Sequence, residues 1–473
     1  MSTDRRGERE TAWRERLDSA LDDRVAGQIV RPGDPEYDEA RSVWNGLVDR
    51  RPAAIVRCTG TADVVACVDV AREHGVPLSV RGGGHNVAGT AVCDDGIVVD
   101  CSEMRGVWVD TDARRVSVQG GATLADVDRE TQLFGLAVPL GVVSDTGVAG
   151  LTLGGGFGHL SRTYGLSCDA LRSADVVTAD GDVLTASAEE HPDLFWALRG
   201  GGGNFGVVTR FEYEAYPVGP DVMACFVVHP AHDRAALFRK YREFCANAPD
   251  EVGLLAFTMW IPDDELFPEH ARDKPGVGFL GSYVGPVDEG ADAFESVRSF
   301  DTPLVDFSGV MPFTELQQML DEDYPDGRRY YWKSLYLDTL SDEAIETIVD
   351  AAESAPSKLS TVDVWQLGGA ISDVDDDETA IGWRDMPHML GIEANWDDPA
   401  DDEANIEWAR TLWSAMQPYS PGGLYVNFPG FGEEGDDLVR AVYGDNYERL
   451  AAVKARYDPE NLFRSNQNVK PTT

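Results

Sequence analysis

The stretch RGGGHNVAG, residues Arg81–Gly89, decides how this chain is interpreted. It follows an apolar run, Val76–Val80, that is typical of a strand. Successive glycines let the backbone adopt positive φ and bring N–H groups against a ligand that any side chain would exclude. Arg81 adds a permanent positive charge, so the loop is suited to holding phosphate groups, and His85 is placed to reach the ring system that they carry. About as many glycine clusters are plain turns as are ligand-binding loops, so further motifs have to decide between these two interpretations.

Those motifs occur in a fixed order along the chain. A second glycine cluster, GVVSDTGVAGLTLGGGFG, spans Gly141–Gly158, and Cys168 follows in RTYGLSCDALRSADVVTADG. Near the C-terminal end are YVNF, which starts at Tyr425, and YDPENLFRSNQNVKP, which ends at Pro471. Together these motifs resemble the berberine bridge enzyme-like branch of the vanillyl-alcohol oxidase superfamily, and the similarity extends from about Arg51 to the last motif.

The resemblance implies a cofactor and the way it is held. In this family FAD is joined covalently to a loop histidine and to a later cysteine. His85 is therefore expected to bind the ring methyl group of the flavin, and Cys168 to bind ring carbon six. The four glycines of Gly200–Gly203 form either a third ligand loop or a sharp turn, and the turn is favoured. The predicted cofactor-binding residues are Arg81, Gly82, Gly83, Gly84, His85, Asn86, Gly89, Thr146, Gly147, Gly150, Gly154, Gly155, Gly156, Gly158, His159, Cys168, Val207, Val208, Asn466 and Asn468.

The length of 473 residues favours two or three domains over one. The resemblance implies an α+β, two-domain, PCMH-type FAD-binding fold, whose second domain is a large antiparallel sheet covered by helices. The predicted units are a charged lead-in at 1–47, an FAD-binding domain at 48–217, a substrate-binding domain at 218–424, and a C-terminal segment at 425–473 that completes the FAD site. Pro217 and Pro220 mark the first boundary of the substrate-binding domain, because one pattern ends there.

Residue periodicity predicts the main elements. In the first half, helices are expected at 61–75, 123–134 and 191–198, and strands at 77–81, 97–101, 107–110, 115–119, 174–179, 183–186 and after Gly206. In the second half, strands are expected at 223–228, 254–261, 276–284, 330–337 and 361–367, and helices near 233–246, 291–299, 341–352 and 401–416.

The charge is strongly one-sided. The 83 acidic and 40 basic residues give a net charge of -43, which repels nucleic acid and anionic membrane surfaces. Self-repulsion of this size destabilises a compact state unless salt screens it, and the Debye length is about 3 Å in molar salt. The acids are spread through periodic sequence rather than gathered in a disordered tail, so the composition predicts a halophilic protein from a high-salt cytoplasm.

Other features of the composition argue against disulfides, metal sites and membrane helices. The seven cysteines are odd in number and contain no CxxC pair, so neither a disulfide framework nor a zinc site is expected. The histidines lack metal-ligand spacing, and no metal is predicted. No segment approaches the ~18 uninterrupted apolar residues of a membrane helix, which predicts a soluble, cytoplasmic protein.

Four residues are candidates for the chemistry. The resemblance places Tyr425 of YVNF over the flavin as general base, with Asn427 beside it. A tyrosine pKa near ~10 has to be lowered before it serves as a base at neutral pH. Lys333 is either aimed at the tyrosine to lower that pKa or is a snorkelling surface lysine. Gln366 lies on a strand expected to face the substrate, where it is predicted to hydrogen-bond a hydroxyl.

The predicted activity is that of an FAD-dependent oxidoreductase. The substrate is expected to be an alcohol or another activated C–H compound, from carbohydrates or secondary metabolites, which gives hydride to the flavin while Tyr425 takes a proton. Oxygen or another electron acceptor then reoxidises the flavin, which leaves oxidase and dehydrogenase both open. A flavin-binding protein without turnover is a further alternative, because the acidic residue that family members often carry soon after Asn427 is replaced here by Pro429, Gly430 and Phe431.

Overall fold

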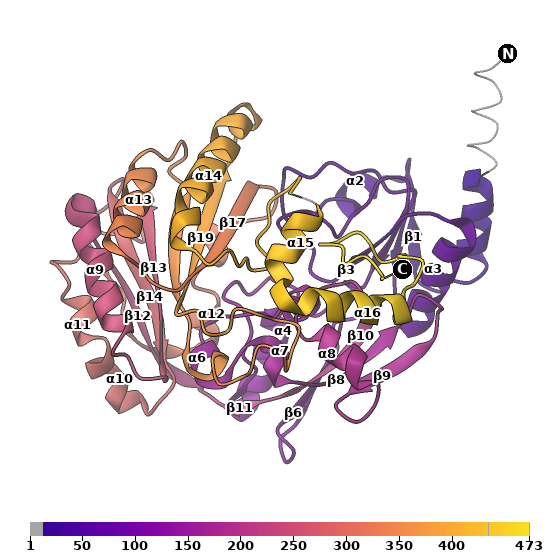
Figure 1. Ribbon diagram of the computed structural model, residues 1–473, viewed down its shortest axis with the longest axis horizontal. Helices are drawn as coiled ribbons and strands as arrows, with labels where there is room; N and C mark the ends of the chain where they lie inside the picture. The colour runs from indigo at the N-terminus through magenta and orange to yellow at the C-terminus, as the bar shows by residue number, and fades with distance from the viewer. Residues whose placement is uncertain (1–12, 434, 473) are drawn as a thin grey trace.

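The computed structural model describes residues 13–433 and 435–472, and every structural statement below refers to these residues. Two groups of sheets lie side by side, one from the first half of the chain and one from the second (Figure 1). The α+β architecture predicted from the sequence is confirmed. The first 12 residues of the predicted lead-in lie outside the described residues.

The first sheet has four strands and carries the first glycine loop. Its order is β1-β2-β4-β3, with β2 and β3 both parallel to β4. The helix α3 connects β2 to β3 and ends at Gly75, whose φ of 64° suits a glycine at a helix terminus. The RGGGHNVAG loop therefore leaves the carboxyl end of a parallel strand. The elements are β1 (Gln28–Val30), β2 (Ala54–Arg57), α3 (Thr61–His74), β3 (Leu78–Arg81) and β4 (Ile97–Asp100).

A five-stranded antiparallel sheet follows, in the order β5-β6-β10-β8-β9. The helix α4 begins at a capping box in which Thr123 and Asp126 satisfy each other's backbone N–H groups. The strands are β5 (Val107–Asp110), β6 (Arg115–Gln119), β8 (Leu171–Val177), β9 (Val183–Ser187) and β10 (Val207–Glu214), and a short ladder joins β7 (Leu136–Ala137) to β11 (Tyr216–Pro217). The helices are α4 (Leu124–Thr131), α5 (Val148–Leu153), α6 (Ser161–Tyr164), α7 (Ser167–Ala170) and α8 (Pro192–Leu198).

The second half of the chain forms an eight-stranded antiparallel sheet. Its order is β15-β12-β14-β13-β18-β19-β17, and β16 also pairs with β12. The helices α9, α13 and α14 cover one face, as the sequence predicted (Figure 1). The strands are β12 (Asp221–Pro230), β13 (Val252–Trp260), β14 (Pro275–Tyr283), β15 (Val305–Asp306), β16 (Gly309–Pro312), β17 (Arg329–Leu337), β18 (Thr361–Gln366) and β19 (His388–Trp396). The helices are α9 (Arg234–Cys245), α10 (Val287–Ala293), α11 (Glu295–Arg298), α12 (Phe313–Gln317), α13 (Asp342–Glu353) and α14 (Asp402–Met416).

The chain then returns to its first half. The helix α15 (Asp436–Tyr443) packs against α16 (Tyr447–Tyr457), α16 packs beside α8, and the tail after them runs back to the first sheet (Figure 1). Neither helix was predicted from the sequence, and neither was β19. All nine residues of β19 are buried, so this strand lacks the alternation that reveals a half-buried strand.

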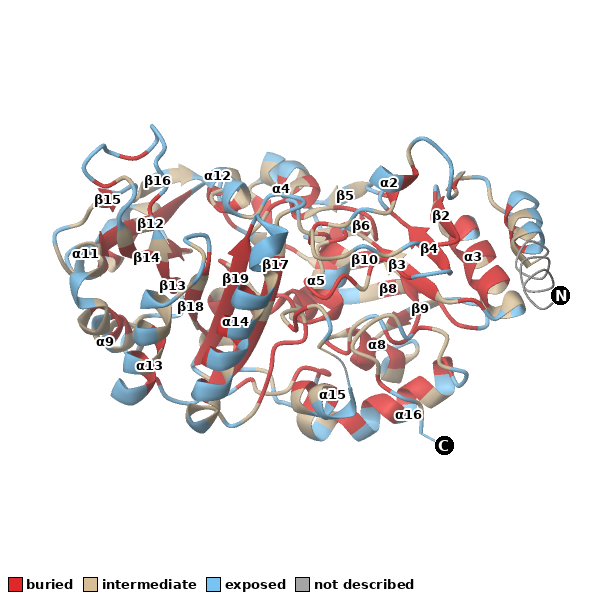
Figure 2. Cartoon of the chain, turned by 90° about the horizontal axis from the view of Figure 1, so that it is seen from above, coloured by how far each residue is buried: buried red, intermediate tan, exposed pale blue. Residues whose placement is uncertain are grey.

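Burial is concentrated in the sheets and on the inner faces of the helices (Figure 2). One apolar cluster lies between the four-stranded sheet and α3, and it includes Leu17 and Leu21 from the predicted lead-in. A larger cluster joins the five-stranded sheet to the helix-covered face of the eight-stranded sheet. The two halves are therefore packed against each other by a continuous core.

Candidate active site

One cavity runs from the first glycine loop to the uncovered face of the eight-stranded sheet. Its walls come from segments far apart in the sequence. The first half contributes Trp44, the 78–87 segment, and residues of the second glycine cluster, including Val142, Val143, Thr146, Gly147 and Gly150. The sheet contributes Phe257, Trp332, Thr361, Asp363, Trp365, Glu393 and Asn395, and the C-terminal part contributes Tyr425, Asn427, Phe428, Phe463, Ser465, Asn466 and Gln467.

The two glycine loops touch backbone to backbone at the cavity wall. A Cβ on Gly83 would lie 2.4 Å from the backbone N of Gly147, and one on Gly147 would lie 2.3 Å from the N of Gly83. No side chain fits at either position, since real Cβ atoms do not approach backbone so closely. Gly84 has a φ of 73°, which favours glycine. The glycines therefore let the two loops pack backbone to backbone in the wall of the cavity.

Arg81 lines the same end of the cavity. Its Nη1 donates a hydrogen bond to the carbonyl oxygen of Ala40 at 2.6 Å and lies 3.6 Å from the Asp100 carboxylate. Its Nε and Nη2 are buried without a protein partner. These two donors are free to bind an anionic group, and burial lowers the pKa of the guanidinium, as happens when a charge lacks full compensation.

His85 is held by a stack of aromatic rings. Its imidazole lies on Trp44, with ring centres 4.8 Å apart, and Trp44 stacks in turn on Tyr330 at 3.7 Å. Burial lowers the pKa of His85 to about 4, so the ring is neutral at pH 7 and keeps a free lone pair. Trp44 belongs to the predicted lead-in, so that segment contributes to the cavity rather than only packing outside.

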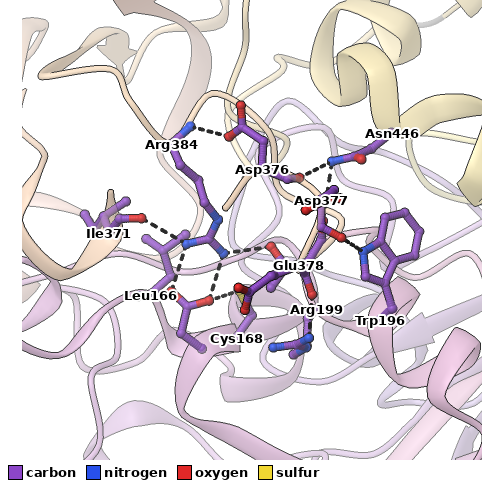
Figure 3. A network of polar contacts seen from close by, with 12 residues as sticks. Leu166, Cys168, Trp196, Arg199, Ile371, Asp376, Asp377, Glu378, Arg384 and Asn446 are labelled. Atoms are coloured by element: carbon purple, nitrogen blue, oxygen red, sulfur yellow. Dashed lines mark hydrogen bonds and ion pairs between the residues drawn. The ribbon is translucent and has the colours of Figure 1, made fainter. Parts of the chain in front are cut away.

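Cys168, the residue expected to form the thiol link, does not line the cavity. The thiol is fully buried in an apolar cluster with Leu166, Tyr336 and Met389, and the same cluster contains Tyr425. It lies under an ion pair in which Arg384 binds the Asp169 carboxylate at 2.8 and 3.0 Å (Figure 3). Burial raises the pKa of the Cys168 thiol well above its ordinary value, which opposes formation of the reactive thiolate.

Several predicted glycines serve packing instead of ligand binding. The backbone N of Cys168 donates to the carbonyl oxygen of Gly155 at 2.9 Å, so the turn at 154–156 is packed against α7. A Cβ on Gly154 would meet Asn427 Oδ1 at 2.1 Å, and one on Gly158 would meet the carbonyl oxygen of Leu140 at 2.1 Å. The predicted cofactor residues that do not line the cavity are Gly89, Gly154, Gly155, Gly156, Gly158, His159, Cys168 and Asn468.

The other predicted cofactor residues do line the cavity: Arg81, Gly82, Gly83, Gly84, His85, Asn86, Thr146, Gly147, Gly150, Val207, Val208 and Asn466. Gly202 and Gly203, from the segment for which a turn was favoured over a ligand loop, line it as well. His159 lies instead in a small hollow behind the sheet, where burial lowers its pKa to about 4.

Lys333 and Gln366 lie on the wrong face of the sheet for the predicted roles. Side chains alternate along a strand, and the neighbouring residues Trp332 and Trp365 are the ones that face the cavity. Lys333 Nζ is 3.0 Å from the Glu433 carboxylate and lies over the Trp413 ring, on the helix-covered side. Gln366 Nε2 donates to the carbonyl oxygen of Cys245, the last residue of α9.

Tyr425 and Asn427 both reach the cavity. Asn427 Nδ2 donates to the Tyr425 hydroxyl at 2.9 Å, and the rings of Phe157 and Phe428 lie 4.9 and 5.2 Å from the tyrosine ring. Burial raises the pKa of Tyr425 above its ordinary value. Because Lys333 is on the opposite face, the expected cation does not offset this effect, and the hydroxyl stays protonated at neutral pH.

Sequence reasoning missed an acidic pair on the cavity face of the sheet. Asp363 of β18 and Glu393 of β19 are each only 3% exposed, and Tyr324 donates its hydroxyl hydrogen to Glu393 Oε2 at 2.7 Å. Burial raises the pKa of Asp363 to about 7, and burial with the neighbouring Asp363 raises that of Glu393 well above its ordinary value. The available signal was an acid placed between apolar residues in a strand, in VDV and in GIEA.

Two sequence profiles match the chain. A profile described as "FAD binding domain" covers residues 52–187, and one described as "Berberine and berberine like" covers residues 424–470. These ranges contain the glycine loops and the YVNF motif that meet at the cavity. The fold and the cavity therefore define an FAD-binding protein with the two-domain PCMH-type architecture that the sequence predicted.

Similar proteins extend over nearly the whole chain. The Bacillus subtilis protein YgaK, named an uncharacterized FAD-linked oxidoreductase, is 33% identical over 95% of this chain and 98% of its own length. The (R)-6-hydroxynicotine oxidase of Paenarthrobacter nicotinovorans is 32% identical over 94% and 97%. The chain belongs to the berberine bridge enzyme-like family of FAD-linked oxidoreductases, and it is an oxidoreductase enzyme.

Solved structures share its fold. The 6-hydroxy-D-nicotine oxidase of Arthrobacter nicotinovorans superposes with a TM-score of 0.85 at 29% identity, over 95% of this chain and 98% of the other. A chitooligosaccharide oxidase has a TM-score of 0.84 at 24% identity, over 97% and 100%. Within the described part of the chain, none of the helices combines the length and apolar character of a membrane span, and no cluster of three or more His, Cys, Asp or Glu side chains is placed to hold a metal ion.

Proposed function

We propose that this enzyme binds one FAD along the cavity and oxidises a small molecule, a carbohydrate or an alkaloid-like compound, at the open face of the sheet. The residues fit the cofactor: both glycine loops line the cavity, and two donors of Arg81 lack a protein partner. Bound FAD supplies the acceptor for a hydride from substrate carbon. The limits 48–217, 218–424 and 425–473 are proposed for the cofactor-binding, substrate-binding and closing units.

We infer one covalent attachment, through His85. The neutral imidazole lies in the cavity wall and keeps a lone pair, whereas the Cys168 thiol lies outside the cavity. Acid-precipitated wild type is expected to stay yellow and to carry the mass of one FAD. His85→Ala is expected to lose the flavin on precipitation, and Cys168→Ala to retain it. A colourless Cys168→Ala precipitate would restore the cysteine to the attachment.

The substrate proton has a better acceptor than Tyr425. Removal of hydride from a carbon leaves a proton to be taken from the attached oxygen or nitrogen. Tyr425 is buried and protonated, so it is suited to donating a hydrogen bond, with Asn427 orienting it at 2.9 Å. Burial raises the pKa of Asp363 to about 7 and raises that of Glu393 well above its ordinary value, and both residues line the same cavity. We propose that this pair accepts the proton.

Anaerobic bleaching of the flavin tests the reaction directly. Purified protein is mixed with a panel of sugars, polyols, phenols and amines, and loss of flavin absorbance is followed. With a compound that bleaches the wild type, Glu393→Gln is expected to slow bleaching more than Tyr425→Phe does. If Tyr425→Phe alone abolishes bleaching, the tyrosine is the base. Readmission of air then separates an oxidase, which recovers its colour within seconds, from a dehydrogenase.

We also propose that the protein works in a high-salt cytoplasm. The observation that supports this is the net charge of -43 on 473 residues. At a Debye length of about 3 Å in molar salt, repulsion between surface carboxylates is largely removed. The melting temperature is expected to rise as KCl increases from millimolar to molar. A melting temperature that is independent of KCl would contradict the proposal.

A further inference from the structure

Trp44 lies where the two halves of the chain meet, against the residue proposed to carry FAD. Its ring stacks on His85 of the first glycine loop, with ring centres 4.8 Å apart and ring planes at 18°. It also stacks on Tyr330 of β17, with ring centres 3.7 Å apart and ring planes at 8°. Trp44 and Tyr330 are 3% and 0% exposed, and they form a small apolar cluster of their own with Val87. The proposed attachment residue is therefore in contact with a ring that the second half of the chain holds in place.

Hydrogen bonds fix Trp44 and its neighbour Asn45 to both halves. Trp44 Nε1 donates to the carbonyl oxygen of Tyr324 at 2.8 Å. The fully buried Asn45 donates from Nδ2 to the carbonyl oxygens of Val87, in the glycine loop, and Tyr330, at 2.6 and 2.8 Å. Such bonds are costly to break, because a buried donor or acceptor that loses its partner does not regain water. The position of Trp44 is thus fixed by β17 as well as by the loop.

The imidazole of His85 has little besides this stack to set its orientation. Within the described chain no charge or hydrogen bond perturbs the ring, whose pKa is lowered to about 4 by burial alone. Rotation of an imidazole about the bond that joins it to its side chain is soft, with broad preferred angles. A flat aromatic neighbour restricts this rotation, since stacked rings attract each other in a limited set of arrangements. The free lone pair lies in the plane of the ring, so its direction is fixed once the ring is fixed.

We propose that Trp44 and Tyr330 are positioning residues for His85: their stack holds the imidazole in one orientation for attachment to FAD, and it is complete only when β17 has docked on the glycine loop. This inference rests on the proposed attachment through His85. Attachment forms one bond between an imidazole nitrogen and the ring methyl carbon of FAD, and it removes one hydrogen from each. The two hydrogens leave as two protons and two electrons, which convert one molecule of dioxygen to hydrogen peroxide.

Tyr330 offers the sharpest test, because it stacks on Trp44 but does not line the cavity. Full-length protein is produced without cofactor in riboflavin-starved cells and mixed with saturating FAD in air. The mass of acid-precipitated chains then gives the attached fraction as a function of time. Tyr330→Leu is expected to slow attachment at least ~10-fold, since a misplacement of about 1 Å can cost a reacting group about 100-fold in rate. Tyr330→Phe keeps the ring and should attach FAD at nearly the wild-type rate.

Tyr331→Leu is the matched control. Tyr331 is the next residue on β17 and is equally buried, but its ring faces the helix-covered side, where its hydroxyl donates to Glu433. This change removes a buried ring and a hydrogen bond without touching the stack, so the rate of attachment should stay at the wild-type value. Equal slowing in Tyr330→Leu and Tyr331→Leu would indicate a general effect of lost packing and would overturn the inference. An unchanged rate in Tyr330→Leu would overturn it as well.

Variants of Trp44 repeat the test at the stacked ring itself, and they decide the matter if circular dichroism shows that Tyr330→Leu does not fold. Trp44 lines the cavity, but rates at saturating FAD are not lowered by weaker binding of the cofactor alone. Trp44→Leu is expected to slow attachment at least ~10-fold, and Trp44→Phe, which restores a flat ring, to recover most of the rate. If Trp44→Phe is as slow as Trp44→Leu, the hydrogen bond of the indole matters rather than the stack, and the inference is wrong.

The wild type separates this inference from the proposed function. Wild-type chains that never gain the mass of FAD would refute attachment through His85, and the inference with it. Wild-type chains that gain this mass no faster than Tyr330→Leu would refute the positioning role alone and leave the attachment standing. Neither result depends on the substrate, because attachment is read from the mass of the chain and not from turnover.

Discussion

Replacing Lys454 by methionine tests whether a buried ion pair holds the C-terminal tail in the cavity wall. The side chains of Lys454 and Asp458 are both 0% exposed, and their charged atoms are 2.6 Å apart. Lys454 Nζ also donates to the carbonyl oxygens of Asn204 and Phe463, each at 2.7 Å. One ammonium group thus joins α16, the loop before β10 and the first tail residue that lines the cavity.

The size of the effect follows from burial. Lys454→Met leaves the Asp458 carboxylate buried, with only the backbone N–H groups of Leu462 and Phe463 as donors, at 2.7 and 2.9 Å. Removing one partner of a buried pair costs about 3–5 kcal/mol, a large part of the roughly 5–15 kcal/mol that stabilises a domain. Lys470→Met is the matched control. Its pair with Asp436 is more than half exposed, so solvent screens the charges and the cost is expected to be small.

Hydrogen exchange read by mass spectrometry measures both variants without assuming two-state unfolding. In Lys454→Met, peptides covering 459–470 are expected to exchange much faster, and flavin fluorescence to rise as Ser465 and Asn466 leave the wall. Ser465 Oγ donates to the carbonyl oxygen of Thr90 at 3.0 Å, so exchange near that residue should rise too. Equal exchange in the Lys454→Met and Lys470→Met proteins would refute the reasoning from burial.

Three further variants test other parts of the structure. Gly83→Ala puts a Cβ 2.4 Å from the Gly147 backbone and is expected to abolish FAD retention. The control Gly309→Ala, whose Cβ meets nothing within 4 Å, should retain FAD. A yellow Gly83→Ala protein would contradict the proposal that the two glycine loops must touch for FAD to bind. Burial raises the pKa of Asp128 to about 7 from ~3.9 in the unfolded chain, so the folded state binds the proton more tightly and stability falls as pH rises between these values, by about 4 kcal/mol in all. The stability advantage of Asp128→Asn over the wild type should therefore grow between pH 5 and 7 and stay constant above pH 7. Thermal unfolding in molar KCl measures this difference. A difference that does not depend on pH would contradict the raised pKa. Arg384→Met leaves the Asp169 carboxylate without its bidentate partner and should lower the melting temperature more than Arg440→Met, which breaks an exposed pair; equal shifts would contradict the importance of the buried pair.

The sequence predicted the parts of this molecule that depend on local pattern. The loop at Arg81–Gly89, the YVNF motif and most strands and helices of the sheets were found, because turn chemistry and residue period are local properties. The strand β19 escaped because both of its faces are buried, so no alternation marks it. The helices α15 and α16 lie in a region that was interpreted only through its motifs.

The predictions of individual site residues differ from the structure for another reason. Lys333 and Gln366 were assigned to the correct strands but to the wrong face, and a shift of one residue, to Trp332 or Trp365, reaches the cavity. The helices α9, α13 and α14 cover one face of the sheet. Which face they cover depends on contacts between residues more than 100 positions apart in the sequence, and a local sequence pattern does not show this. Cys168 and the glycines at 154–158 do not line the cavity, and the sequence could not show this because a buried thiol and a closely packed glycine look the same in sequence as a reactive thiol and a ligand loop.

The acidic pair, Asp363 and Glu393, differs from most other acidic residues of this chain because it is buried. Most of the 83 acidic residues belong to an excess that water and salt can screen, and their positions are interchangeable. Asp363 and Glu393 are 3% exposed, so salt screens them little, and nothing in the general acidity of the protein explains why two strands should carry them inward. Neither do they stabilise the fold, since a buried carboxyl without a cationic partner costs free energy that an apolar residue would not. Their position on the sheet face that lines the cavity supports the proposal that they accept a proton from the substrate.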